Sequence, residues 1–457
     1  MKRLLTTLFI FSVFCLFGLC RTVDAGNHDI DLRIADSYTT SSYYSLPPHV
    51  TRHLDSHTGM GSYDPIESRY SDCGGCYGHR SLRWWERVRL YGWIEAGMYF
   101  NADGNRSRHE HALGRDGKSE RYQIPNTGNS TQLGNVRSTD PMLNQLWLGL
   151  ERKLDTRRGF DWGFQVDFLF GTDGWMSQSY GDATFDYRNH SRDYYVSLPQ
   201  LYASLGYKRW SVKIGKFETM LGFEHLQANR SFFYSHSNLF YTEPQTHSGV
   251  QFEYRCSDKL WFTFGYVQGA DGSFENRFDD HGFLGGVYWR PVSTVTLWYT
   301  VYAADLGNGQ YRNGEDRYGG TIFQHTFVAN WKVSDRWDYS FQWNLGDRDG
   351  KGRNPDATFF ATAHYLTYRI NCRWRLGLRF DQVHANQWMR NSGFSRPQTG
   401  EFIGDLYSVT LGANWQPFRR INVRPEIRYD YAEDCRPYDR GRSRGQFSGG
   451  LGIVYLF

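Results

Sequence analysis

Charged side chains recur at even spacing in two late segments of the chain, residues 375–381 and 424–428. Successive side chains of a β-strand point to opposite faces, so residues two or four apart share one face. Each segment would therefore present a charged face. Such a face is either solvated and paired locally, or it sets up a transverse field that orients dissolved solutes. The six residues are Arg375, Arg379, Asp381, Arg424, Glu426 and Arg428.

Residues 219–245 mix charged and aromatic side chains in one segment. A patch this aromatic would be costly to leave in water, so we expect the segment to be buried inside the molecule or at an interface between subunits. The charged members are Glu224, His225, Arg230, His236 and Glu243, and the aromatic members are Phe223, Phe232, Phe233, Tyr234, Phe240 and Tyr241.

The same segment offers hydroxyl and imidazole groups to a hydrolase. Ser235, His236 and Ser237 are consecutive, and His247 follows. A nucleophile needs its base within hydrogen-bond reach, but adjacent residues of a strand face opposite ways. The chain also contains no HExxH motif. We therefore expect no enzyme, no cofactor and no metal, with a hydrolase kept as the less favoured alternative.

The elements that must position these groups show an alternation of apolar and polar residues with a period of two. The segment 160–170, for example, places Phe160, Trp162 and Phe164 on one face and Asp161 and Gln165 on the other. This is the pattern of half-buried β-strands. Sixteen such segments occur: 88–100, 142–153, 160–170, 198–207, 211–218, 246–256, 260–270, 282–290, 294–303, 322–333, 337–345, 358–370, 375–384, 406–416, 421–430 and 446–457.

The connections between these segments alternate between short and long. Seven short turns alternate with eight longer loops, so all long connections would lie at one end. This sidedness is typical of an outer-membrane barrel with short periplasmic turns and long external loops. Only a closed barrel pairs every backbone group of strands that cross a membrane. We therefore predict an all-β fold, a transmembrane antiparallel β-barrel of about sixteen strands. A secreted β-sandwich that binds carbohydrate remains the alternative.

Composition excludes several other classes. The chain has 16 Trp, 32 Tyr, 32 Phe and 48 Gly, with a mean hydropathy of −0.64. Beyond the first twenty residues no run approaches the ~20 apolar positions of a spanning helix. The abundant aromatics argue against intrinsic disorder. A formal charge of +4 gives no basic field for nucleic acid, so we expect no nucleic-acid partner.

The two ends of the chain carry further signals. Residues 1–25 read as a secretory signal peptide: a basic start, an uncharged apolar run, and small residues before a break after Ala25. Residues 26–86 lack periodicity and form a predicted irregular periplasmic extension, in which Cys73 and Cys76 favour a local disulfide. Residues 87–457 form the predicted barrel domain. The last strand ends at Phe457, which is typical of the terminal signal for barrel insertion.

Several segments resemble the OmpL-like family of β-barrel porins, the porin-2 type. They are GWIEAG at 92–97, LNQLWL at 143–148, LPQLY at 198–202, FFYSHS at 232–237 and EPQTHSGV at 243–250. The similarity is strongest from about residue 90 to 290 and does not include the extension. It implies an outer-membrane channel that contacts membrane lipid and passes small hydrophilic solutes or ions, without catalytic residues. It also makes a homotrimer plausible.

The resemblance gives residues 219–245 a role. They lie between the fifth and sixth predicted strands, where sixteen-stranded porins carry the loop that folds inward and narrows the pore. We therefore expect Glu224, His225, Arg230, His236 and Glu243 to form a constriction, with the acidic residues opposing the arginines across a narrow lumen. The two charged faces described above would line the pore.

Overall fold

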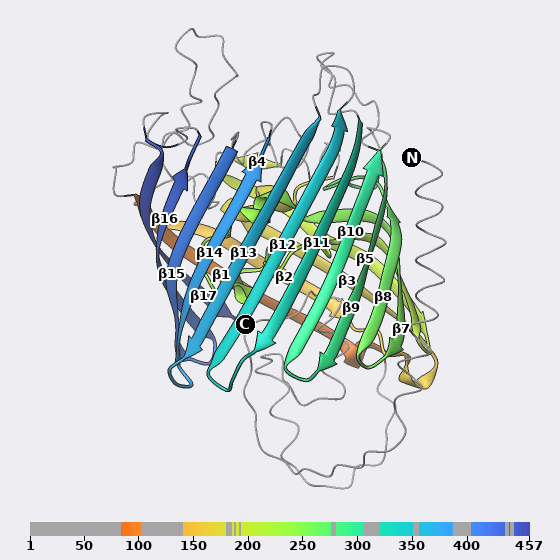
Figure 1. The fold of residues 1–457 in the computed structure, drawn as a ribbon. Coiled ribbons are helices and arrows are strands. Elements are labelled where there is room, and N and C mark those ends of the chain that lie inside the picture. The colour runs from red at the N-terminus through yellow and green to blue at the C-terminus, as the bar shows by residue number, and fades with distance from the viewer. Residues whose placement is uncertain are drawn as a thin grey trace.

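The computed structural model shows sixteen antiparallel strands closed into a barrel (Figure 1). The structure describes residues 84–101, 140–179, 185–186, 189–191, 193–275, 280–305, 320–350, 356–386, 404–434, 438 and 443–457. The predicted signal peptide and nearly all of the predicted extension, including Cys73 and Cys76, lie outside these residues. Among the described residues no helix is long and apolar enough to cross a membrane.

The barrel strands follow one another around the wall in chain order. They are β1 (Val88–Asn101), β2 (Met142–Arg152), β3 (Phe160–Gly171), β5 (Tyr194–Tyr207), β6 (Trp210–Glu218), β7 (Thr246–Ser257), β8 (Leu260–Val267), β9 (His281–Val292), β10 (Val295–Asp305), β11 (Gly320–Lys332), β12 (Trp337–Gly350), β13 (Ala357–Arg369), β14 (Trp374–Ala385), β15 (Gly404–Phe418), β16 (Ile421–Ala432) and β17 (Gly445–Leu456). A two-residue strand, β4 (His190–Ser191), pairs with β5 at its beginning.

The predicted fold class and strand count are confirmed, and so is the alternation of connections. The strand bounds leave seven turns of two to seven residues, such as residues 208–209 and 419–420. The eight connections that alternate with them have 12 residues or more, as in residues 219–245, except for the six residues 351–356. Neighbouring strands are antiparallel, so the short turns gather at one end of the barrel (Figure 1).

The alternation also separates the two faces of the wall. On β14, Leu376, Leu378 and Phe380 are 41%, 43% and 37% exposed, whereas Arg379 and Asp381, which alternate with them, are fully buried. Apolar side chains therefore face outward and charged ones face the interior, as in a barrel surrounded by lipid. Exposed tryptophans stand near the short-turn ends of several strands, including Trp337, Trp374 and Trp415.

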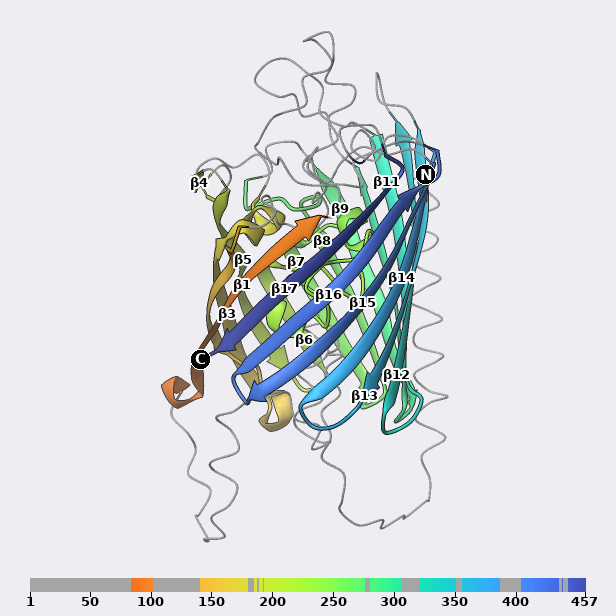
Figure 2. The same cartoon turned by 90° about the vertical axis from the view of Figure 1, so that its left-hand side faces the viewer.

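The barrel closes between its first and last strands, which lie side by side in Figure 2. β1 and β17 pair from Trp93 opposite Leu456 to Asn101 opposite Ser448. The terminal residue continues this ladder, because the Phe457 N–H donates to the Gly92 carbonyl at 3.0 Å. The chain end is thus part of the seam that completes the sheet, and no edge is left unpaired there.

Candidate functional site

Residues 219–245, called the strap below, run from β6 to β7 through the barrel interior. The strap includes two short 3-10 helices, η6 (Ala228–Arg230) and η7 (Leu239–Thr242). Gln145 of β2, Gln324 of β11 and Asn414 of β15 each donate a hydrogen bond to a strap carbonyl, at 2.8, 3.1 and 2.7 Å. Strands from widely separated parts of the wall therefore hold the strap from inside.

Glycines on the inner face of the wall receive the aromatic side chains of the strap. Tyr234 lies against Gly97 of β1 and Gly452 of β17, where an added Cβ would come within 2.4 Å of its hydroxyl and of its ring, respectively. Phe232 lies against Gly377 of β14, where a Cβ would come within 2.2 Å of the ring. Only glycine leaves room for such close approach of ring and backbone. Glycine positions on the inner wall thus fix where the strap rests.

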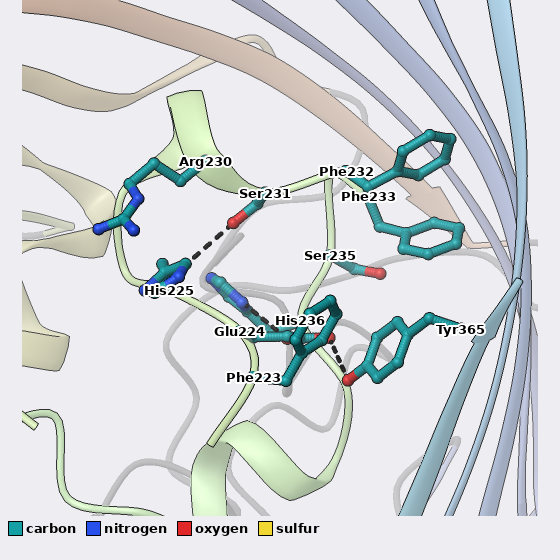
Figure 3. Close-up of a pocket in the computed structure, with 10 residues that line it drawn as sticks. All are labelled: Phe223, Glu224, His225, Arg230, Ser231, Phe232, Phe233, Ser235, His236 and Tyr365. Atoms are coloured by element: carbon teal, nitrogen blue, oxygen red, sulfur yellow. Dashed lines mark hydrogen bonds and ion pairs between the residues drawn. The ribbon is translucent and has the colours of Figure 1, made fainter. Parts of the chain in front are cut away.

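Glu224 is the electrostatic centre of the strap (Figure 3). Its carboxylate receives hydrogen bonds from Arg379 at 3.2 Å, from the Tyr365 hydroxyl at 3.0 Å and from the Ser237 N–H at 2.9 Å, and His236 Nδ1 lies 3.0 Å away. Burial by itself would raise the pKa of this carboxyl. The charge of Arg379 and the hydrogen bonds of His236 and Ser237 outweigh burial and lower the pKa to about 2. Glu224 is therefore ionised and held at its position.

Glu243 has the opposite environment although it is an equally buried carboxyl. Its Oε1 accepts hydrogen bonds from Gln342 at 2.6 Å and Asn344 at 2.7 Å, both neutral amides. Burial raises its pKa to about 8, because the hydrogen bonds from Asn344 and Gln342 do not compensate for the lost hydration, and the negative charge of Glu224 raises the pKa further. Its other oxygen packs against Gly222, whose φ is +84°, and this contact joins the two ends of the strap.

Three arginines bind the strap backbone directly. Arg424 donates to the carbonyls of Ala228, Ser231 and Phe233 at 2.9, 3.0 and 3.1 Å and pairs with Glu95 of β1. Guanidinium groups suit this task because they offer five donors in a fixed plane.

The other two arginines share one strap carbonyl. Arg379 and Arg428 both donate to the carbonyl of His236, at 3.2 and 2.6 Å, and Arg428 also pairs with Asp430 at 2.7 Å. The guanidinium groups are thus ligands of the strap.

The acidic residues of the same strands bind strap N–H groups. Asp381 accepts from the Asn238 N–H at 2.9 Å, and Glu426 accepts from two consecutive strap N–H groups at 2.9 and 3.1 Å. Arg375 lies on the same inner face of β14, closer to the short turns, and is 8% exposed. All six residues of the charged faces thus point inward, and five of them bind the strap.

The structure differs from the expected opposition of charges across a narrow lumen. Glu224 touches Arg379 directly, and Glu243 contacts amides instead of arginines. Side chains that were expected to border water are buried beneath the strap, with Arg379, Arg424 and Arg428 at most 1% exposed. The reason is geometric: the strap is long enough to cross the interior and contact β14 and β16 directly, so no water-filled gap separates it from their arginines.

The sequence analysis missed several partners of the strap. Glu95, Gln342 and Asn344 carried no signal as single residues, and the inward glycines were counted only as composition. All of these residues lie at inward-facing positions of strands in which apolar and polar residues alternate. A search for glycines and amides at inward-facing positions would therefore find the glycines and the two amides.

The serine and histidine groups take part in anchoring. Ser235 Oγ accepts a hydrogen bond from Arg379 at 3.0 Å, His236 Nδ1 bonds to Glu224, and His247 Nδ1 lies 3.0 Å from the Gly269 carbonyl. Ser235 and His236 therefore bond to different partners and not to each other. His247 Nε2 also lies 3.2 Å from the Thr219 hydroxyl, so this imidazole links the first residue of the strap to the connection after β8.

Comparison with known proteins agrees with the fold. The family model described as "Putative beta-barrel porin-2, OmpL-like" matches residues 87–457. The chain belongs to this family. Among curated proteins, none matches the chain. The matched range of the OmpL-like family covers the barrel and the strap together.

Solved structures similar to this OmpL-like chain include outer-membrane proteins. One is the loop L8 deletion mutant of OmpT, an outer membrane protein of Vibrio cholerae, with a TM-score of 0.50, 14% identity, 81% of this chain and 99% of that chain covered. Another is OmpF of Salmonella typhi in complex with daunomycin, with a TM-score of 0.51, 12% identity and coverage of 81% and 97%. At these identities the likeness concerns the fold. Family and fold indicate an outer-membrane porin.

Proposed function

We propose that this protein is an outer-membrane channel through which small hydrophilic solutes or ions diffuse passively, and that the strap is its constriction. The observation that carries the proposal is the path of the strap, which crosses the interior and bonds to β2, β11 and β15. A segment fixed at this depth reduces the open cross-section of a sixteen-stranded barrel, whose interior would otherwise hold an aqueous channel.

The two alternatives fit the structure less well. A carbohydrate-binding sandwich needs two packed sheets, whereas this sheet closes on itself. A barrel hydrolase needs an accessible pair of hydroxyl and imidazole. Ser235 and His236 bond to Arg379 and Glu224 instead, and His247, which lies 3.2 Å from the Thr219 hydroxyl, is fully buried. A non-enzymatic channel is therefore the function that the site supports best.

Lipid and a second copy of the chain are the proposed partners of the outer wall. The exposed residues of β14 and its neighbours are apolar, so they suit an acyl environment. We further propose secretion with removal of residues 1–25, and a homotrimer as the assembled form. Crosslinking of the protein in native membranes tests the assembly.

Planar-bilayer recording tests the channel and its constriction together. Deletion of residues 226–240 should raise single-channel conductance, because it removes most of the anchored strap. A second variant should replace the same residues with a Gly/Ser linker of equal length, which keeps the chain length and removes the anchors. Wild-type protein without ion conductance, or unchanged conductance in both variants, would overturn the proposal.

A further inference from the structure

The seven turns that gather at one end of the barrel are rich in basic side chains. Eight basic side chains that the structure describes there are called the basic ring below, and all are exposed apart from the half-buried Lys153. They are Lys153, Arg157, Lys208, Arg209, Lys259, Arg336, Arg373 and Arg420. Arg419 of the last turn makes a further contact and is not counted in the ring. The same turns contain three acidic residues, Asp155, Asp258 and Asp335.

Pairing within the protein removes little of this positive charge. Arg157 contacts Asp155 at 2.8 Å, and the other seven ring residues contact no carboxylate in the described part of the chain. If each acidic residue of the turns is set against one ring residue, whatever their contacts, five positive charges remain. The strand residues within two positions of a turn do not reverse the sign. They are the basic Arg152, Lys332, Arg369 and Arg375 and the acidic Glu151, Asp161 and Asp338.

Aromatic side chains on the outer wall show the depth of the ring in the membrane. Exposed aromatic residues stand within two positions of several turns, and they include Tyr207, Trp210, Trp331, Trp337, Trp374 and Phe418. Such belts lie at the boundary between acyl chains and headgroups. The Lys208 ammonium lies 5.0 Å from the centre of the Tyr207 ring. Arg336 donates to the Tyr368 hydroxyl at 3.3 Å. The ring charges are therefore next to the belt, at the level of the headgroups.

The opposite end of the barrel has charges of the other sign. Four charged residues occupy the last two strand positions beside the long connections, and all four are acidic: Glu218, Asp305, Asp349 and Asp405. Positive charge is therefore concentrated at one rim of the wall and is not a general property of the strand ends.

We propose that the basic ring binds the anionic headgroups of phospholipids in the membrane leaflet on the short-turn side. Lys and Arg at the membrane surface are attracted by the net negative charge of an anionic leaflet, and Arg also binds phosphate through two parallel hydrogen bonds. A zwitterionic lipid offers the same phosphate but carries a compensating cation. The ring should therefore prefer anionic lipid, and salt should weaken the preference. This inference goes beyond the proposed channel and does not require conductance.

Electron spin resonance of spin-labelled lipids tests the proposal on the full-length folded protein in phosphatidylcholine vesicles. Wild-type protein at low salt should associate with labelled phosphatidylglycerol at least about twofold more strongly than with labelled phosphatidylcholine. The preference should disappear at about 1 M NaCl, where the screening length is only about 3 Å.

Three variants vary the charge of the turns while leaving the wall unchanged. The quadruple variant R209Q/K259Q/R373Q/R420Q removes four of the five excess charges and should abolish most of the preference. The matched variant R209K/R373K/R420K keeps the charge and should keep the preference. D258N with D335N removes acidic residues of the same turns and should strengthen it.

The outcomes decide between lipid and other occupants of the ring. Equal association of the two lipids with wild-type protein would overturn the proposal, since another part of the chain or another molecule would then cover the ring. An unchanged preference in the quadruple variant, shown to be folded by its heat-modifiable band, would also overturn it. Inorganic phosphate should weaken the preference no more than NaCl of equal ionic strength; stronger competition would indicate a site for free phosphate instead. Absence of conductance would overturn the proposed function and leave this inference standing.

Discussion

Replacement of Glu224 with Gln should loosen the strap, because it removes the negative charge that Arg379 and His236 contact. The variant keeps the size and shape of the side chain. It leaves the buried Arg379 guanidinium with Asp381, whose carboxylate is 3.6 Å away, as its nearest remaining acid. Loss of one partner from a buried ion pair typically costs ~3–5 kcal/mol.

The pKa of Glu224 gives a second route to the magnitude. The pKa of Glu224 is about 2 in the folded protein and 4.5 ordinarily. This difference corresponds to about 3 kcal/mol in the free energy of unfolding when Glu224 is ionised. The folded pKa is the lower one, so this stabilisation is present above pH 4.5 and is lost as the pH falls toward 2. Both routes give about 3 kcal/mol, and the E224Q variant should lose it at neutral pH.

Glu243 supplies the matched control within the same segment. Its pKa of about 8 keeps it largely protonated at pH 7, so E243Q replaces one neutral group with another. The folded pKa is raised here, so ionisation weakens the fold as the pH rises from 4.5 through 8. E243Q should therefore resemble wild-type protein near pH 4 and be increasingly more stable than wild-type protein as the pH rises from 4.5 to 8.

Two measurements report on the strap. Urea unfolding in detergent micelles gives the change in free energy, and single-channel current noise reports local detachment. E224Q should show a lower urea midpoint and a noisier open channel at pH 7, and E243Q should show neither. Equal behaviour of the two variants at pH 7 would refute the assignment of one charged and one neutral carboxyl.

Three further predictions concern the seam between β1 and β17, the glycines that receive the aromatic rings of the strap, and the orientation of the barrel in the membrane. Removal of Phe457 should reduce the heat-modifiable folded form on gels, since its N–H closes the ladder to Gly92; normal yield would contradict this. Gly377→Ala should cost about 1–3 kcal/mol by urea unfolding, because a Cβ would meet the Phe232 ring at 2.2 Å. Cys372, exposed in a short turn, should react with a bulky maleimide only after the outer membrane of cells is permeabilised; mass spectrometry of its peptide would show labelling of intact cells if the orientation is reversed.

The sequence predicts the barrel well because the period-two alternation is a local property of each strand. The segment 160–170 shows it within eleven residues, and the alternation of turns and loops then orders the strands. The strap is different. Its composition and place point inward, but the contact between Glu224 and Arg379 joins residues 155 positions apart, and no local pattern encodes it. The distinct states of Glu224 and Glu243 likewise depend on which wall residues face each carboxyl.

The anchoring of the strap has a consequence for biogenesis. The residues that hold the strap come from both ends of the chain. Glu95 on β1 pairs with Arg424 on β16, which binds the strap backbone, and Tyr234 of the strap lies against Gly97 on β1 and Gly452 on β17. Contacts between such distant residues form late in folding. A barrel whose seam is still open therefore lacks the contacts that the first and last strands make with the strap together, and insertion of such an intermediate would leave a wide hole in the membrane. Closure of the seam and narrowing of the channel by the strap then occur together, so the membrane never holds a closed barrel whose interior is still wide open.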